Sequence, residues 1–287
     1  MRSVHDGMAD LFGLVGVVSG SRLRARFYDG GGGALLLRDW FDTELGIPCR
    51  FVRTRAGPTR CLPVTTTLFL DSTCAMPVLH EACSDPPPPY VTLMTPWVGG
   101  AVYATGDKYT GGLRQISGAS GLCIDARASS SGSAVGWLYG AGAEISPERF
   151  VAATVRWVPT VGGSIRTVQA DDGSSQVTVE MPELRLNPLT PPEPPAFAPG
   201  AIVYIGSGRL RLPAYADAQG KVIGWTPIDF GFLDTQVGLW CQVATFADGL
   251  RCVPRNVHVS EAVARTACGP PPSAEDGAWA PVTDVTQ

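Results

Sequence analysis

The clearest pattern of hydrophobic and polar positions along the chain has a period of two. In residues 22–28, arginines alternate with Leu23, Ala25 and Phe27, so apolar side chains fall on one face and polar ones on the other. This alternation predicts a half-buried strand. Asp29 and the glycines after it predict a turn, and the apolar segment 34–41 predicts the antiparallel partner strand.

A second hairpin is predicted by the alternating segments 164–169 and 176–181, which flank Asp171, Asp172 and Gly173. These aspartates could contact calcium, but too few oxygen ligands are spaced around them, and a hairpin turn explains them fully.

Two other local signals are informative. Residues 90–109 contain two strand candidates on either side of Gly99 and Gly100. Ser146 followed by Pro147 predicts a single helical turn, with serine as its cap and proline at its first position. We expect the apolar residues directly after this turn, Phe150 and Val151, to attach it to the core.

One segment of the chain has a counterpart further on. The outline of residues 42–63 returns at residues 234–254, and each copy contains two cysteines with a turn between them. A hairpin would place the two sulfurs of each copy opposite each other, so we expect a disulfide clasp in both. A third clasp is expected shortly after the first copy. The six predicted disulfide cysteines are Cys49, Cys61, Cys74, Cys83, Cys241 and Cys252.

The repeat and a proline-rich stretch give a predicted organisation. Residues 1–18 are an uncertain N-terminal segment, residues 19–181 a full β repeat unit, residues 182–200 a proline-rich connector and residues 201–287 a partial second unit.

The composition favours an all-β fold. Charged residues make up only 17% of the 287 residues, while the chain has 34 glycines and 25 prolines, as expected for short strands joined by tight turns. We expect repeated antiparallel hairpins in a β-propeller-like arrangement. Two linked β-sandwich or barrel units are the alternative.

Charge and cysteine usage limit the function classes. The net charge of −4 lacks the basic footprint of a nucleic-acid-binding protein. The apolar run at residues 11–18 is too short to span a bilayer, so no membrane span is expected. The paired cysteines are typical of an oxidising compartment, which favours an extracellular or cell-envelope location, although an export signal is not evident.

Candidate catalytic and metal-binding residues each have a simpler interpretation. Asp42 and Glu44 could form an acid–base pair, but Gln236 replaces the glutamate in the second copy, which favours hydrogen bonding at a turn. Cys74, His80 and Cys83 offer three zinc ligands without a fourth, which favours a disulfide.

Cys123 could be a nucleophile, but it more simply pairs with Cys268 or is buried free. Gly140 and Gly142 lack the third glycine of a dinucleotide fingerprint. We therefore predict no catalytic residue, no metal and no cofactor.

Two residue classes could bind a ligand. The arginine face of Arg22, Arg24 and Arg26, with Arg209 and Arg211 in the second half, could hold an anionic glycan or phosphate, or could be a solvated sheet face. The tryptophans could include a platform for sugar stacking, but most are expected to be core anchors. The candidates are six of the seven tryptophans: Trp40, Trp97, Trp137, Trp157, Trp225 and Trp240.

Several of these motifs together resemble a family of cysteine-containing repeat proteins common in myxobacteria. The matching motifs lie at residues 42–46, 60–63, 71–74, 102–103 and 140–154, and the resemblance covers most of the chain. It implies an exported envelope or secreted protein and no assigned reaction.

These observations lead to one main hypothesis and two rivals. The main one is a non-enzymatic exported or cell-envelope protein that binds a glycan or a protein partner. The rivals are an extracellular hydrolase and a purely structural component of an envelope assembly.

Overall fold

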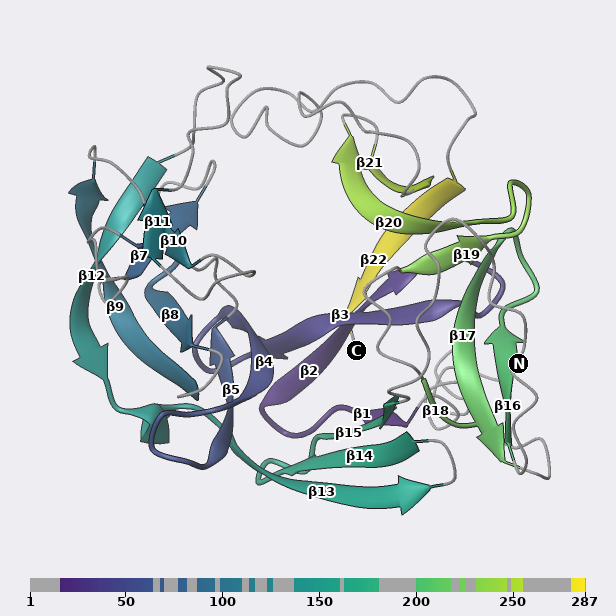
Figure 1. Ribbon diagram of the computed structural model, residues 1–287, viewed down its shortest axis with the longest axis horizontal. Coiled ribbons are helices and arrows are strands. Elements are labelled where there is room, and N and C mark those ends of the chain that lie inside the picture. Colours follow the sequence, from purple (N-terminus) through teal and green to yellow (C-terminus); the bar gives the residue numbers. More distant parts are fainter. Residues whose placement is uncertain are drawn as a thin grey trace. The chain divides into compact units, whose positions relative to one another are not determined.

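The computed structural model describes most of the strand-forming parts of the chain. The residues described are 16–63, 68–69, 77–81, 87–95, 99–109, 114–116, 123–125, 137–160, 163–180, 200–217, 222–225, 231–246, 249–254 and 280–286. They form strands joined by turns, one 3-10 turn and no α-helix, so the predicted all-β class is confirmed (Figure 1).

The chain divides into two compact units. Unit 1 comprises Met1–Thr43, Thr154–Val259 and Pro271–Gln287, and unit 2 comprises Glu44–Ala153 and Ser260–Pro270. These units are defined by spatial contacts and not by sequence repetition. The repeat boundaries at residues 19–181, 182–200 and 201–287 stay a prediction.

Unit 1 contains thirteen of the named strands in whole or in part. They are β1 (Val17–Val18), β2 (Leu23–Asp29), β3 (Leu35–Asp42), β13 (Ala152–Thr160), β14 (Gly163–Ala170), β15 (Ser175–Glu180), β16 (Gly200–Ile205), β17 (Leu210–Asp217), β18 (Val222–Trp225), β19 (Phe232–Asp234), β20 (Leu239–Phe246), β21 (Gly249–Pro254) and β22 (Ala280–Thr286). The division between the units falls within β13.

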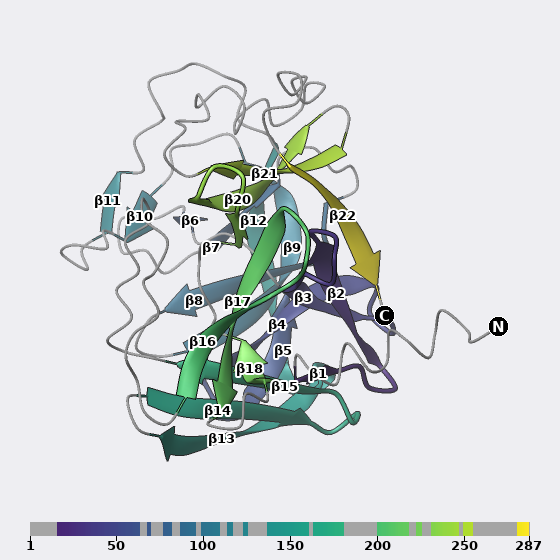
Figure 2. The ribbon, with the colours of Figure 1, turned by 90° about the vertical axis from the view of Figure 1, so that its right-hand side faces the viewer.

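Neighbouring strands in unit 1 follow two paths. One runs β3-β2-β22-β21-β20-β19-β17-β16 and the other β1-β15-β14-β13, while β18 pairs with both β15 and β17. The long hairpin of β16 and β17 and the strands β13 and β14 can be followed in Figure 2. The antiparallel pairs β2–β3 and β14–β15 confirm the two hairpins that the alternating sequence segments predict.

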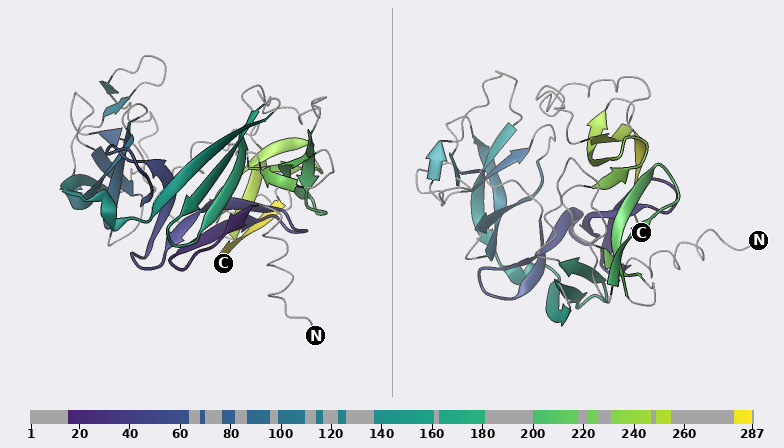
Figure 3. Two further views of the ribbon diagram at one scale, coloured as in Figure 1. Left: turned by 90° about the horizontal axis from the view of Figure 1, so that it is seen from below. Right: turned by 45° about the vertical axis from the view of Figure 1, so that its right-hand side comes forward.

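The core of unit 1 explains why β2 alternates. Leu23, Ala25 and Phe27 are fully buried, whereas the arginines between them are half-buried. In Figure 3 the purple strands β2 and β3 lie beside each other, in agreement with their antiparallel pairing. A further buried cluster contains Leu210 and Phe232 together with Cys241 and Cys252.

Unit 2 contains nine of the named strands, the 3-10 turn and the first two residues of β13. They are β4 (Ile47–Arg53), β5 (Thr59–Pro63), β6 (Leu68–Phe69), β7 (Pro77–Glu81), β8 (Tyr90–Thr95), β9 (Gly99–Tyr109), β10 (Arg114–Ile116), β11 (Cys123–Asp125), β12 (Trp137–Ile145), η1 (Pro147–Arg149) and the first two residues of β13. The hairpin β4–β5 pairs with the start of β13, and the other strands form a seven-stranded sheet in the order β11-β10-β6-β7-β12-β9-β8.

The predicted helical turn is confirmed as η1. Ser146 caps it by accepting a hydrogen bond from the Glu148 N–H, and Pro147 occupies its first position. Phe150 and Val151 behind it are buried, and Phe150 joins a cluster with Ile47, Leu62, Tyr90 and Val102. This cluster attaches the turn to both the hairpin and the sheet of unit 2.

Candidate functional site

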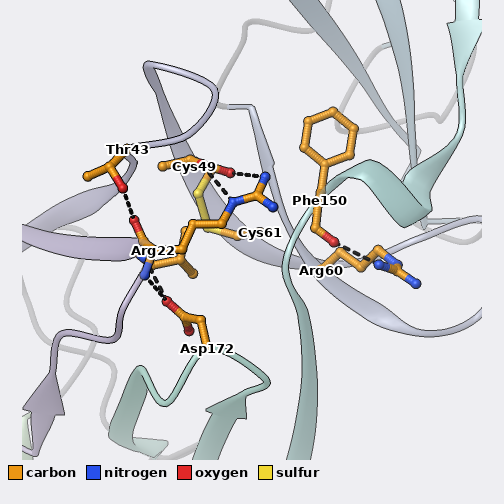
Figure 4. Close-up of polar contacts among 9 residues, drawn as sticks. Arg22, Thr43, Cys49, Arg60, Cys61, Phe150 and Asp172 are labelled. Atoms are coloured by element: carbon orange, nitrogen blue, oxygen red, sulfur yellow. Dashed lines mark hydrogen bonds and ion pairs between the residues drawn. A yellow bond between two sulfur atoms is a disulfide. The ribbon is translucent and has the colours of Figure 1, made fainter.

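The first residue of the repeated outline makes a buried ion pair in unit 1. Both carboxylate oxygens of Asp42, which is 0% exposed, accept hydrogen bonds from Arg22, at 2.9 Å from Nε and 2.7 Å from Nη2. The Thr43 hydroxyl donates to the Arg22 carbonyl at 2.8 Å, and the Thr43 N–H donates to the same oxygen (Figure 4). Asp42 is therefore committed to an internal latch.

The second outline has the same local structure. Arg209 contacts the fully buried Asp234 through Nε at 2.9 Å and Nη2 at 2.7 Å, and the Thr235 hydroxyl donates to the Arg209 carbonyl at 2.8 Å. Leu210 lies opposite Asp234 in the ladder, as Leu23 lies opposite Asp42. We call these two arrangements the arginine latches.

The other arginines of the predicted binding face differ in their surroundings. Arg26 binds the buried carboxylate of Asp39 at 2.5 Å and lies over the Phe41 ring at 5.3 Å from its centre. Arg24 and Arg211 are half-buried. Three of the five predicted binding arginines thus neutralise carboxylates of this chain, and a ligand-binding role for the set stays a prediction.

Asp172 joins the β14–β15 turn to the start of β2. Its Oδ2 accepts the backbone N–H groups of Arg22 at 3.1 Å (Figure 4) and Leu23 at 2.6 Å. Its Oδ1 accepts hydrogen bonds from Ser174. Burial raises the pKa of the Asp172 carboxyl, but these hydrogen bonds outweigh it, so the pKa is lowered from its ordinary value. The oxygens hold the turn in place, as the hairpin interpretation requires.

Two of the predicted disulfides are present. Cys49 bonds to Cys61 (Figure 4) and Cys241 bonds to Cys252. The hairpin brings the two sulfurs together as expected, but the cysteines are not paired directly in the register, because Cys49 faces Pro63 and Cys61 faces Phe51. The bond is diagonal across the hairpin, and it spans a Cα–Cα distance of 5.2 Å.

Cys123 is also in a disulfide, so it is not a free thiol nucleophile. Cys74 and Cys83 lie outside the described residues, and with them lie the predicted bridge between the two and the alternative zinc site that adds His80. Cys268, the expected partner of Cys123, lies outside them as well. Among the residues whose placement is described, no group of three or more His, Cys, Asp or Glu side chains is arranged to hold a metal ion.

No helix in the described ranges has the length and apolar character needed to cross a membrane.

The tryptophans fall into two groups where their side chains are described. Trp40 and Trp240 are fully buried core anchors, as expected for most of the set. Trp157 on β13 is 52% exposed, and the Arg166 guanidinium lies 5.8 Å from its ring centre. Val158, the next residue, is also exposed, and alternation along the strand places it on the opposite face of β13 from Trp157.

Unit 2 contains a pocket of about 230 Å³. Three segments form its walls: the turn of the disulfide-clasped hairpin, the start of β9, and the end of β12 with the first residue of η1. The lining residues are Thr54, Arg55, Ala56, Gly100, Ala101, Val102, Glu144, Ile145 and Pro147.

Backbone contacts fix these walls to one another. The Arg55 N–H donates to the Gly100 carbonyl at 2.9 Å, which ties the hairpin turn to β9, and Ile145 of β12 pairs with Val102 of β9. Gly99 has a φ of +91°, and a Cβ there would lie 2.7 Å from the Thr54 carbonyl oxygen. Only glycine permits this close approach.

The far side of the hairpin is fixed as well. An Arg60 guanidinium nitrogen donates to the Phe150 carbonyl at 2.7 Å (Figure 4). The Cys61 N–H donates to the Val151 carbonyl at 3.0 Å. The disulfide and these bonds hold the hairpin against the segment that follows η1. The pocket is therefore a preformed feature of unit 2.

Sequence reasoning did not identify Thr54, Arg55 or Glu144. The glycine pair at 99–100 was the one available signal, and it indicated the break between two strands. The structure shows a second role, because Gly99 also allows the hairpin turn at Thr54 to approach closely. The charged residues carry no pattern of their own, since the strands that bring them together are distant in sequence.

Comparisons with known proteins return no match: no family model matches the chain, no curated protein matches it, and no solved structure does.

Proposed function

We propose that the protein is a non-enzymatic exported or cell-envelope protein that binds a partner through the pocket of unit 2. Two disulfides among the described residues are compatible with an oxidising compartment. The resemblance to the myxobacterial cysteine-containing repeat proteins supports export and assigns no reaction. A propeller-like arrangement of the whole chain, or two linked sandwiches or barrels, belongs to the same proposal.

The pocket carries this proposal. Its volume of about 230 Å³ is below the roughly 300–1,000 Å³ of pockets that enclose drug-sized ligands. It therefore suits a ligand, or one group of a larger partner, of the size of a single amino acid or sugar. Fixed walls favour binding, because little conformational entropy is lost when the ligand enters.

The surroundings of the candidate catalytic residues support a non-enzymatic role. Asp42 is fully buried with both oxygens on Arg22, so it is poorly placed to exchange protons with a substrate. Cys123 is held in a disulfide. A hydrolase that acts on extracellular polymer would need another set of residues, and a structural role in an envelope assembly would need an extended interface.

A ligand panel with a blocked pocket tests the proposal. Monosaccharides, amino acids and short peptides are added to the purified oxidised protein, and the melting temperature is measured. Ala56 is exposed at the pocket wall, so Ala56→Trp should abolish the shift caused by any true ligand. Ala143 is exposed on β12 and does not line the pocket, so Ala143→Trp should respond as wild type. A panel without any Ala56-dependent shift contradicts the proposal.

Glycan binding on unit 1 is a second candidate function. The observation that favours it is the exposed Trp157 with Arg166 over its ring, since an indole face stacks on sugar rings and arginine attracts acidic groups. A glycan array should then give signals that Trp157→Ala removes and Val158→Ala keeps. An array without signals for the wild-type protein contradicts this second candidate.

A further inference from the structure

Thr54, which lines the pocket of unit 2, has a buried hydroxyl that no described residue satisfies. Thr54 is 1% exposed, and its Oγ1 makes no hydrogen bond with the described protein. Its backbone groups are used in the hairpin turn, where its N–H donates to the Pro58 carbonyl and its carbonyl accepts from Gly57. A buried hydroxyl without a partner is unfavourable. Because this oxygen is closed to water, a ligand group bonds to it only after the Thr54 side chain rotates, and that bond then adds affinity.

Two side chains of opposite charge line the same pocket. Arg55 in the hairpin turn and Glu144 on β12 are both exposed, and no ion pair joins them or engages either among the described residues. A guanidinium binds carboxylates with two parallel hydrogen bonds, and a carboxylate accepts from an ammonium group. The pocket therefore offers a complementary partner for each end of a zwitterion.

The rest of the lining is aliphatic. Ala101, Val102, Ile145 and Pro147 provide apolar contact, and no aromatic ring lines the pocket on which a sugar could stack. This favours a branched or straight aliphatic group over a sugar ring. The small volume excludes a long peptide from the interior.

We propose that the pocket binds a free aliphatic α-amino acid of about the size of leucine in its zwitterionic form. The ligand carboxylate binds Arg55, its ammonium group binds Glu144, and its side chain packs on Val102, Ile145 and Pro147. The Thr54 hydroxyl bonds to one of the ligand's polar groups. This assignment rests on the proposed binding function and specifies its ligand.

Calorimetric titration of the oxidised protein tests the assignment without any mutation. L-leucine should bind at least about tenfold more tightly than L-leucinamide, which lacks the carboxylate, and than N-acetyl-L-leucine, which lacks the ammonium group. Equal affinities for the three compounds, or no heat from leucine at millimolar concentration, overturn the assignment.

Variants then assign each ligand group to a residue. Arg55→Gln should remove the preference for leucine over leucinamide, and Glu144→Gln should remove the preference over N-acetyl-leucine. Thr54→Val should weaken leucine binding severalfold. The controls Arg53→Gln and Glu148→Gln change exposed charges close in sequence that do not line the pocket, and they should bind as wild type. If a control loses binding as fully as its partner variant, the assignment is wrong.

The two proposals fail in different ways. If a sugar or a peptide gives an Ala56-dependent shift and leucine does not bind, the ligand class is wrong and the binding function stands. If no compound of any class gives such a shift, both fail.

Discussion

The arginine latches allow a quantitative test of what stabilises unit 1, and Asp42→Asn is the most direct change. The substitution keeps the size of the side chain and removes its charge. Asp42 is 0% exposed, and both of its oxygens accept hydrogen bonds from Arg22, so the asparagine amide nitrogen must replace one acceptor with a donor that faces the guanidinium.

The expected loss of stability depends on how deeply Asp42 and Arg22 are each buried. Removing one partner of a fully buried ion pair costs about 3–5 kcal/mol, because the other charge is left without compensation. The Arg22 side chain is 22% exposed, so water can recover part of its solvation. We therefore expect Asp42→Asn to lower the free energy of unfolding by about 2–4 kcal/mol.

The second latch provides a repeat of the experiment within the same molecule. Arg209 is 25% exposed and Asp234 is 0% exposed, so Asp234→Asn should cost as much as Asp42→Asn. Urea unfolding followed by tryptophan fluorescence measures both. Asp171 is exposed in the β14–β15 turn, and Asp171→Asn should change stability by less than about 0.5 kcal/mol.

A double-mutant cycle with Arg22→Gln isolates the pairwise term. Once Arg22 is absent, Asp42→Asn should cost much less than it does in the wild-type background. The argument is refuted if Asp42→Asn is as mild as the Asp171 control, or if the cycle shows no coupling between the two residues.

Three further predictions concern the clasp and the β2 contact. Replacing Cys49 and Cys61 together by alanine opens a loop with a sequence separation of 12, and denaturant unfolding should show a loss of about 2.8 kcal/mol in the chain-entropy model; an unchanged midpoint argues against it. Because the pKa of Asp172 is lowered in the folded protein, its carboxylate stabilises the fold above the unfolded pKa near 4 and loses that effect as pH falls through the folded pKa. Asp172→Asn should therefore flatten the stability profile measured between about pH 4 and pH 2, and a profile parallel to wild type counts against it. Gly20→Ala would place a Cβ 2.4 Å from Oδ2 of Asp172 and should cost about 1–3 kcal/mol in thermal unfolding, whereas a neutral result would mean that the contact yields freely.

Local patterns in the sequence were sufficient for much of the secondary structure. The alternation in residues 22–28 predicts β2 because one face of that strand is fully buried, and Ser146 with Pro147 predicts η1 because cap and turn chemistry are local. The diagonal course of the Cys49–Cys61 bond was not predictable, since spacing alone does not fix which residues face each other across a hairpin.

The pocket could not be predicted for a different reason. Thr54, Gly100 and Glu144 come from three separate elements, and their proximity depends on pairings such as Thr54 with Gly100 that join distant parts of the chain. The arginines were singled out because charge on a strand is conspicuous in a sequence. Their carboxylate partners are as conspicuous, but which arginine pairs with which aspartate is decided by the register of β2 with β3 and of β17 with β19.

The two segments that share a sequence outline also share their local structure. The latch and the clasp have the same form in both copies, with disulfides of sequence separation 12 and 11. The sequences between the paired cysteines differ: Arg55, Ala56, Gly57 and Pro58 stand in the first outline, and Ala247, Asp248 and Gly249 in the second. In the first copy the tip lines the pocket and supplies Arg55. The proposed binding function requires this division, because a rigid framework fixes the position of the loop while the residues of the loop determine which ligand is bound.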